Sequence, residues 1–426
     1  MKDVSRRNAA SVAVGALLKF SVGSQFAISV WNSQLRDTLH LTQSEIALVG
    51  ACMTFGQYNS IWAGFFVDAF GVQWCAAAAA ALLAGGYWTI ASLSPGVAPW
   101  IVSTCFVFIG FAHSFPAIAA IAANEGLYGT RHRGKILGFL VACYSIGGAS
   151  FAYIYRLWFD HAVISYFNWL GFYLLVVCLL GVLLLRPVMH IHDTNDAISI
   201  EATKSPDEVP LLASPRPHHE DERNVTLLAL LRHPTFWFLF APVLVGIGSA
   251  MFVMNNISFI VESASSSVEQ VATDQIAFLV SLFSICNLVG RFAMGILSDH
   301  FFVSIPRRSF LAASVLAVGL AQLLFLVVPP SLIAVPILAT GFSEGCIYAL
   351  FPVMTRELFG PRHFGKNYGL VSLAVAVGFP LLLSPLSTYI YHLHATPDGS
   401  CHGKLCFGPT FAIAAALSLV GAYCSC

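Results

Sequence analysis

Two ionisable side chains stand near the middle of long apolar stretches of this sequence. Lys19 lies in one such stretch near the N-terminus, and Glu344 lies in another in the second half of the chain. A charge surrounded by hydrocarbon is costly, so such a residue usually faces a partner or a water-filled cavity. We expect Lys19 to bind an anionic group of a ligand, and Glu344 to carry an exchangeable proton or to pair with Lys19 when the site is empty. The alternative for both is a static ion pair that holds the fold in register.

A third charge, Arg291 in "CNLVGRF", lies toward one end of its apolar stretch. Its planar guanidinium is suited to a carboxylate of a ligand, because it can donate two parallel hydrogen bonds. Its depth instead favours a structural bridge to Asp299 or Glu357.

Uncharged polar residues in other apolar stretches are weaker candidates. His113 can relay protons near neutral pH, although a single His in an apolar helix is often hydrogen-bonded to a neighbour and inert. Asn255 and Asn256 can hydrogen-bond a ligand or join neighbouring helices. Both alternatives stay open for each residue.

A short motif occurs twice, each time at the end of an apolar stretch. "GFFVDAFG" contains Gly64, Asp68 and Gly71, and "GILSDHF" contains Gly295 and Asp299. The two Gly-x-x-x-Asp copies are 231 positions apart (295 − 64). We expect them to occupy equivalent turns of an internal repeat and to act in gating.

The composition identifies a membrane protein. Of the 426 residues 57% are hydrophobic and 10% are charged, which is too few charges to cover a soluble surface of this size. The apolar blocks are about 18 to 25 residues long, the length of a helix that crosses the bilayer. We therefore predict an all-α membrane protein with twelve transmembrane helices. The expected spans are 10–31, 45–67, 74–94, 99–123, 134–157, 165–186, 236–261, 275–297, 309–329, 332–355, 367–391 and 407–426.

The spans divide into two halves. Residues 187–233 form the one long polar stretch and are expected to be a disordered cytosolic linker between six-helix bundles at 1–186 and 234–426. Most of the 21 Lys and Arg fall in segments on the same side as the N-terminus, which predicts that this side is cytosolic. Two parallel six-span repeats are typical of a secondary transporter with its site near the midplane.

The repeated motif resembles the signature of the major facilitator transporters, Gly-x-x-x-Asp-x-x-Gly after helix two. Longer stretches resemble the nodulin-like, nuclear-fusion-defective type, among them "RGKILGFLVACYSIGGASFAYIY", "GIGSAMFVMNNISFIVES" and "ELFGPRHFGKNYG". This type is distantly similar to oxalate, formate and monocarboxylate carriers. The resemblance implies two pseudo-symmetric bundles, with Lys19 and Glu344 on opposite sides of a central cavity. It also implies a carboxylate-binding role for Arg291.

Three further groups lie outside the expected spans. Glu125, Arg131 and Arg133 follow the fourth span and are expected to form the gate cluster of the first half. Cys401 and Cys406 flank the exterior loop "CHGKLC", where a disulfide is expected, with a zinc site as the alternative. In the linker, "DEVPLL" with Asp207, Leu211 and Leu212 resembles a sorting signal. A sorting adaptor would there direct the protein to a vacuolar or endolysosomal membrane rather than the plasma membrane.

These patterns favour secondary transport of a small organic anion by alternating access, coupled to protons. The alternatives are a carrier of another solute, such as an amino acid, a sugar or a metal chelate, and a receptor or scaffold that does not transport. No enzyme motif, nucleotide-binding loop, cofactor or metal pattern is found, and the zero net charge does not indicate nucleic acid.

Overall fold

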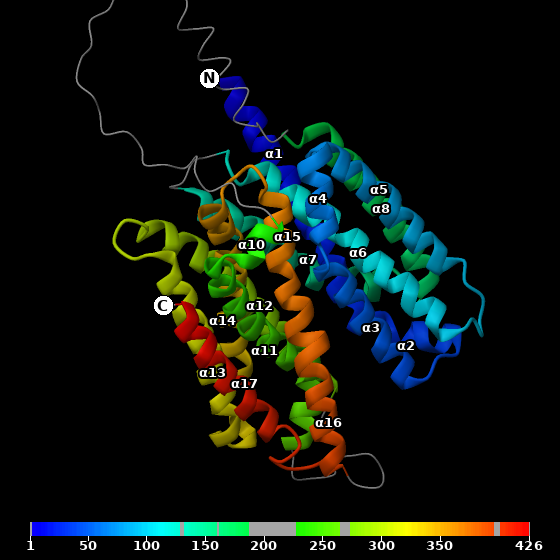
Figure 1. Ribbon diagram of the computed structural model, residues 1–426. Coiled ribbons are helices and arrows are strands. Elements are labelled where there is room, and N and C mark those ends of the chain that lie inside the picture. The colour runs from blue at the N-terminus through cyan, green and yellow to red at the C-terminus, as the bar shows by residue number, and fades with distance from the viewer. Residues whose placement is uncertain are drawn as a thin grey trace, which may run out of the picture.

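The computed structural model describes residues 2–127, 132–159, 162–186, 227–264, 273–395 and 401–425. Arg131 and the "DEVPLL" residues Asp207, Leu211 and Leu212 lie outside these ranges. Every regular element in them is helical (Figure 1). In a lipid environment a helix satisfies its backbone hydrogen bonds within itself, which explains this architecture for so apolar a chain.

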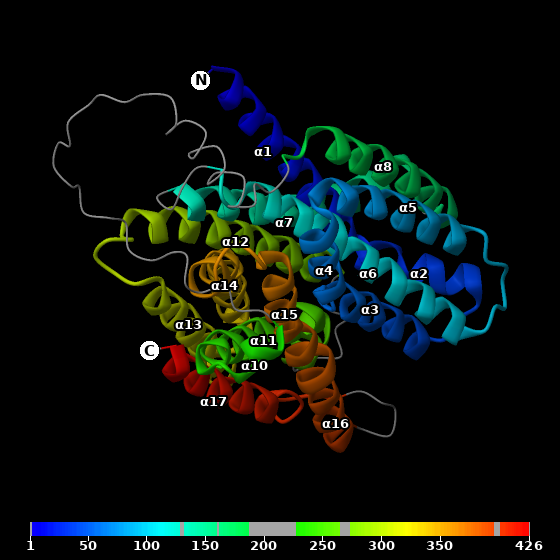
Figure 2. The same ribbon diagram turned by 45° about the horizontal axis from the view of Figure 1, so that its top comes forward.

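The first half of the chain forms one group of helices and the second half another (Figures 1 and 2). The first group consists of α1 (Lys2–Val22), η1 (Gly23–Ala27), α2 (Ile28–Leu39), α3 (Gln43–Tyr58), α4 (Ile61–Phe70), α5 (Val72–Ala91), α6 (Pro99–Asn124), α7 (Arg133–Trp158) and α8 (Val163–Leu184). The second consists of α10 (Leu227–Arg232), α11 (Pro234–Ala264), α12 (Thr273–His300), α13 (Arg307–Val327), η3 (Pro330–Leu332), α14 (Ala334–Phe359), α15 (Phe364–Ala376), η4 (Val377–Leu383), α16 (Ser384–His394) and α17 (Gly408–Ser425).

Within the described ranges nine helical segments are long and apolar enough to cross a membrane, and the shorter α17 is also apolar. The first two expected spans are not among the nine, and each is divided. In the first, α1 is 21 residues long but contains Arg6, Arg7 and Lys19. The first is α1, η1 and α2 in succession, and the second is α3 and α4 with a break at Asn59 and Ser60. The eleventh is continuous but contains the π-helical turn η4, which includes Pro380.

The expected linker is shorter at its C-terminal end than the sequence predicted. Residues 227–232 form α10 rather than disordered chain, and Leu230 is fully buried. An apolar "LLALL" segment can bury its leucines against α11 and α15, which explains the helix.

Glycines 231 residues apart (378 − 147) make equivalent close contacts in the two groups. A Cβ on Gly147 of α7 would meet the Phe20 carbonyl oxygen at 1.9 Å, beside Gly23. A Cβ on Gly378 of η4 would meet the Leu244 carbonyl oxygen at 2.3 Å, beside Gly248. Because only glycine permits this approach, the repeat extends from the gate motif to the internal packing of each group.

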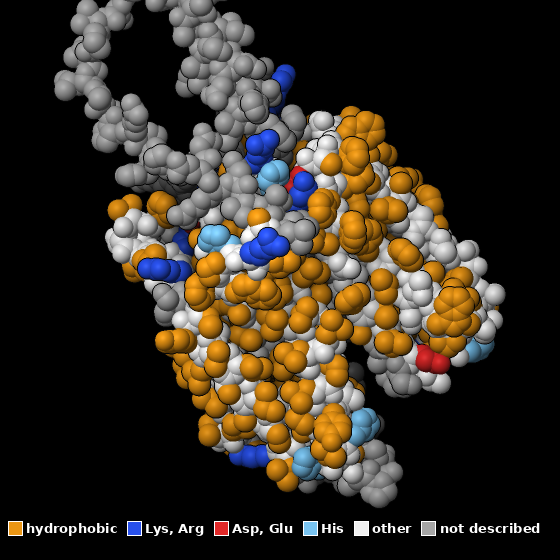
Figure 3. Space-filling view, in the orientation of Figure 1, with side chains coloured by type: hydrophobic (Ala, Val, Ile, Leu, Met, Phe, Trp, Pro, Cys, Tyr) orange, Lys and Arg blue, Asp and Glu red, His pale blue; other side chains and the backbone are white. Residues whose placement is uncertain are grey.

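The two ends of the molecule differ. We call the end where α4, α6, α12 and α14 finish the linker end, and the end that carries Cys401 and Cys406 the disulfide end. At the linker end α4 packs on α15 and α7 packs on α12, across the two groups. At the disulfide end α3 and α16 diverge, and the space-filling view shows a notch between the groups (Figures 1 and 3). In Figure 3 the Lys and Arg side chains gather mainly at the linker end, whereas the flanks are mostly hydrophobic.

Candidate functional site

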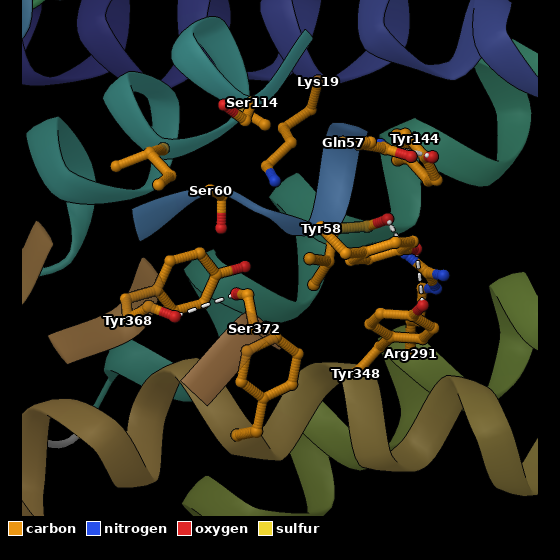
Figure 4. A pocket seen from close by; sticks show the side chains of 14 residues that line it. Lys19, Gln57, Tyr58, Ser60, Ser114, Tyr144, Arg291, Tyr348, Tyr368 and Ser372 are labelled. Atoms are coloured by element: carbon orange, nitrogen blue, oxygen red, sulfur yellow. Dashed lines mark hydrogen bonds between the residues drawn. The ribbon is translucent and has the colours of Figure 1, made fainter. Parts of the chain in front are cut away.

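A cavity of about 50 Å³ lies between the two helix groups. Figure 4 shows its side chains, which come from both groups. The lining residues are Lys19, Gln57, Tyr58, Ser60, Ser114, Ala117, Ile118, Val141, Tyr144, Arg291, Tyr348, Phe351, Tyr368 and Ser372. The break between α3 and α4 supplies Tyr58 and Ser60, so the interruption of the second span directs polar groups into the cavity.

Two cations line this cavity, and both are almost fully buried. Lys19 of α1 is 5% exposed and Arg291 of α12 is 3% exposed. In Figure 4 the Lys19 ammonium points toward the middle of the cavity, and Arg291 lies at one edge behind the tyrosines. Within the part of the chain that the structure describes, no Asp or Glu lines the cavity. The site therefore carries positive charge directed at whatever occupies it.

The protein holds Arg291 by several contacts. Its Nε donates to Asn287 Oδ1 over 2.6 Å, and its Nη1 donates to the Val141 carbonyl oxygen over 2.9 Å. Its Cζ lies 4.2 Å from the ring centroid of Tyr348 and 5.6 Å from that of Tyr144. A guanidinium favours this arrangement over an aromatic face, and its planar fork can donate further hydrogen bonds toward the cavity.

Glu344 of α14 acts on Arg291 through an amide. Asn287 Nδ2 donates to Glu344 Oε2 over 2.8 Å, while Asn287 Oδ1 accepts from both Arg291 and the Ser145 hydroxyl, the latter at 3.1 Å. Glu344 is 2% exposed and does not line the cavity. The Glu344 carboxylate is thus separated from the Arg291 guanidinium by one residue, Asn287, which is hydrogen-bonded to both.

Tyrosines join the two groups at the cavity. The hydroxyls of Tyr58 and Tyr348 are 2.6 Å apart and connect the two groups. Gln57 Nε2 donates to the Tyr144 hydroxyl over 2.8 Å within the first group. Tyr368 stacks on Phe351 with ring centroids 5.2 Å apart, forming an aromatic wall.

Two of the expected pairings of buried charges are wrong. Among the described residues no ion pair joins Lys19 to Glu344, because Glu344 is turned to Asn287 and Lys19 to the cavity. Arg291 does not bridge to Asp299 or Glu357, because Arg307 pairs with both of those acids.

His113 does not reach the cavity. Its ring is fully buried in α6, and its Nε2 lies 3.0 Å from the Tyr87 hydroxyl of α5. His113 is therefore hydrogen-bonded to a neighbour and does not face the central cavity in this structure.

Asn255 and Asn256 of α11 bond their own helix. Their amides donate to the carbonyl oxygens of Met251 and Phe252, each over 2.8 Å. Asn256 also has non-helical backbone angles, which mark a kink. Neither residue lines the cavity, so a ligand contact is not made in this conformation.

Each motif aspartate caps a helix of the other group at the linker end. Asp68 accepts from the backbone N–H groups of Gly365 (3.0 Å) and Lys366 (2.9 Å), at the start of α15. Asp299 accepts from those of Gly134 (3.0 Å) and Lys135 (2.8 Å), at the start of α7. A carboxylate at a helix N-terminus satisfies unpaired N–H groups and interacts favourably with the helix dipole.

The motif glycines make these contacts possible. A Cβ on Gly64 would meet the Gly365 carbonyl oxygen at 2.0 Å, and one on Gly295 would meet the Gly134 carbonyl oxygen at 2.7 Å. Gly71 ends α4 with φ +87°, a left-handed conformation that favours glycine.

Ion pairs surround these caps and cross between the groups. Arg356 pairs with Glu125 at 2.6 Å, and Arg133 lies 3.9 Å from both Glu125 and Glu357. Arg307 pairs with Asp299 at 2.6 Å and also with Glu357. Glu125 and Arg133 of the expected cluster are thus brought together here.

At the opposite end a disulfide joins Cys401 to Cys406. Lys404, within the loop that it closes, donates to the Leu326 carbonyl oxygen over 2.8 Å. In the ranges that the structure covers, no group of three or more His, Cys, Asp or Glu side chains is arranged to hold a metal ion.

Sequence reasoning did not identify the tyrosine network or the roles of Asn287, Arg307 and Arg356. Asn287 and Arg291 are four positions apart on one helix face, and this spacing was a signal for the role of Asn287. The tyrosines gave none, because single aromatic residues are common in apolar helices.

Known proteins share features of this chain. The family model for the Major Facilitator Superfamily matches residues 14–273 and 243–425. The uncharacterized MFS-type transporter YhjX of Escherichia coli (strain K12) is 23% identical over 371 residues, which cover 86% of this chain and 84% of that protein. Monocarboxylate transporter 12 of Mus musculus is 27% identical over 290 residues, covering 65% of this chain and 57% of that protein. The crystal structure of the transporter FucP in the outward conformation gives a TM-score of 0.62 at 15% identity, covering 98% of this chain and 99% of that one.

Proposed function

This chain belongs to the Major Facilitator Superfamily of membrane transporters, and we propose that it carries a small organic anion, such as a monocarboxylate, together with a proton. The observation that supports this most is the pair of buried cations, Lys19 and Arg291, in one cavity without a lining carboxylate. A buried ammonium without an acidic partner is unstable unless a ligand supplies the negative charge.

The cavity's other lining residues are consistent with a small amphipathic acid. Ser60, Ser114 and Ser372 offer hydroxyls, whereas Phe351 and Ile118 offer apolar contact. A volume of about 50 Å³ admits only a few non-hydrogen atoms in this conformation. The likeness to mouse monocarboxylate transporter 12 adds support.

Proton coupling is assigned to Glu344. Its side chain is as fully buried as those of the two cations, and the amide of Asn287 links its carboxylate to Arg291. Alternating access then requires the caps at Asp68 and Asp299 to release when the linker end opens.

Three finer assignments belong to the same proposal. The linker end faces the cytosol, because Lys and Arg accumulate there. The linker sequence around Asp207, Leu211 and Leu212 selects an endolysosomal or vacuolar membrane. The stretches quoted from the sequence assign the chain to the nodulin-like branch.

The test is uptake of radiolabelled monocarboxylates by vesicles that contain the purified full chain. We expect uptake by the wild type, a loss of on the order of tenfold or more in Lys19→Ala because a buried charge partner is removed, and partial recovery in Lys19→Arg. Lys404→Ala is the matched control, since Lys404 lies in the disulfide loop outside the cavity. The proposal is contradicted if the wild type takes up sugars or amino acids but no monocarboxylate. It is also contradicted if Lys19→Ala takes up monocarboxylates as well as the wild type does.

Proton coupling is tested in the same vesicles with an imposed pH gradient. We expect an inward proton gradient to accelerate uptake in the wild type, and Glu344→Gln to abolish the acceleration because the amide cannot take up a proton. Uptake that is indifferent to both the gradient and the substitution excludes coupling through Glu344.

A further inference from the structure

We propose that Glu344 is a positioning residue that sets the charge of the preferred solute, acting through Asn287 on Arg291 without contacting the solute. With its carboxylate ionised the site prefers a monoanion. Removing that charge, by protonation or by substitution, strengthens the binding of anions in general and of dianions most. This inference rests on the proposed function, and it adds a specificity determinant to it.

The hydrogen bonds around Asn287 have a direction. Its Oδ1 accepts from Arg291 Nε (2.6 Å) and from Ser145 Oγ (3.1 Å), and its Nδ2 donates to Glu344 Oε2 (2.8 Å). An ionised carboxylate only accepts hydrogen bonds, so it must face the NH₂ of the amide. That choice directs the amide oxygen toward the guanidinium and fixes the side of Arg291 that stays open to the cavity.

Few other groups act on Glu344. Asn287 and Arg291 face it from α12, Tyr144 faces it from α7, and Tyr348 lies one turn along its own helix. Of these only Arg291 is charged at neutral pH. Glu344 is therefore a buried negative charge that offsets part of the positive charge of the cavity without occupying space in it.

The charges of the site predict the solute. Lys19 and Arg291 together carry two positive charges, and one ionised Glu344 leaves a single charge for the solute to neutralise. Replacing Glu344 by Gln raises the charge of the site by one unit. In a poorly hydrated site an unmatched charge is costly, so the preference moves toward solutes with one more negative charge.

The first half of the repeat contains no second carboxylate at the equivalent position. His113 lies 231 residues before Glu344 (344 − 113), is also fully buried, and contacts Tyr87 rather than the cavity. It is thus a control matched in depth that lacks the connection to Arg291.

The experiment is competition between lactate and malonate, three-carbon acids that differ by one carboxylate, for uptake of radiolabelled lactate at pH 7.5. It uses the purified full chain in vesicles and compares the wild type with Glu344→Gln, Glu344→Asp and His113→Gln. The measured quantity is the ratio of the half-inhibitory concentrations of the two acids.

In Glu344→Gln we expect the half-inhibitory concentration of malonate to fall relative to that of lactate by on the order of tenfold. This is the effect of one unit charge on the solute's second carboxylate across roughly 10 Å at an effective dielectric constant of about 20. Glu344→Asp and His113→Gln should keep the wild-type ratio. Glu344→Met also removes the charge with a side chain of similar length, so it should shift the ratio in the same direction even if Glu344→Gln does not fold.

The outcomes separate the two proposals. A wild type that binds neither acid overturns the proposed function and this inference with it. A wild type that binds lactate, with the same ratio in Glu344→Gln or in Glu344→Met, overturns the inference alone. A shift of equal size in His113→Gln also overturns it, because the effect would then come from any buried polar change at this depth.

Discussion

At the scale of single residues, Tyr348 connects the cation of the cavity to the contact between the two halves. Its ring lies under Arg291 with Cζ 4.2 Å from the centroid, and its hydroxyl is 2.6 Å from that of Tyr58 in the other half. A solute that binds Arg291 therefore also affects Tyr348, the side chain that joins the two halves.

Tyr348→Phe separates these two functions. The ring and its contact with the guanidinium remain, but a buried hydrogen bond worth roughly 0.5–1.5 kcal/mol is lost. We expect solute affinity to change little and the population closed at the linker end to fall by about two- to tenfold.

Spin labels at Leu48 of α3 and Tyr389 of α16, both exposed, report this population as a distance across the notch. Tyr144→Phe is the matched control, because the Tyr144 hydroxyl bonds Gln57 within the first half. An unchanged distance distribution in Tyr348→Phe, or an equal change in Tyr144→Phe, contradicts the role of this contact.

The sequence predicted some of these residues for a clear physical reason. Lys19 was recognisable because a lone charge in an apolar stretch has few alternatives to a cavity. Arg291 was assigned by its depth along a helix, and depth does not tell which way a side chain points. The hydrogen bond of Tyr58 with Tyr348 joins residues 290 positions apart, so no local pattern indicates it.

At the scale of elements, two helices begin at carboxylates that belong to the other half. Asp68 caps α15 and Asp299 caps α7, so closing the linker end completes two helix N-termini. Asp299 also pairs with the buried Arg307 at 2.6 Å.

We therefore expect Asp299→Asn to lower the stability of the chain as well as to weaken the cap on α7. An asparagine keeps one acceptor, and loss of an N-cap bond costs about 0.5–2 kcal/mol. Asp299→Asn also removes one of the two acidic partners of the buried Arg307, the other being Glu357. Both variants should slow solute exchange, and Asp299→Asn should also lower the thermal midpoint of the chain.

Exchange rates in vesicles and thermal unfolding of the purified chain measure these effects. Asp37→Asn is the control, because Asp37 is exposed and pairs only locally with Arg36. Wild-type exchange in both gate variants removes the gating role, and a wild-type thermal midpoint in Asp299→Asn contradicts the contribution of Arg307.

The bounds of the helices were predictable wherever an apolar stretch long enough to span the membrane is uninterrupted. Spans such as α5, α6 and α8 agree with the expected ranges to within three residues. The break at Asn59 and Ser60 was not predicted, because the run around it is apolar enough to read as one helix. At the break Ser60 and Ile61 lie close to Gly369 of the second half, and a local pattern does not contain such a contact.

At the scale of the whole molecule, the repeat explains why the motif occurs twice. Each copy packs against the start of a helix in the opposite half, so the two contacts are related by the same symmetry that relates the halves. A molecule closed at one end by two equivalent contacts opens only when both are broken together. That requirement makes the halves move as units rather than helix by helix.

Gly64→Leu tests this closure directly. A Cβ at this position would lie 2.0 Å from the Gly365 carbonyl oxygen, a backbone atom that cannot move without displacing α15. We expect the substituted chain to remain open at the linker end and uptake to fall by on the order of tenfold or more. In a second variant that also carries Ser372→Cys, the new thiol lines the cavity and should then react with a membrane-impermeant thiol reagent added from the linker side. Gly85→Leu is the control, because Gly85 lies in α5 with no atom within 4 Å of the added Cβ. If Gly64→Leu transports like the wild type and the introduced thiol stays protected from the linker side, the close approach of α4 and α15 does not gate the site.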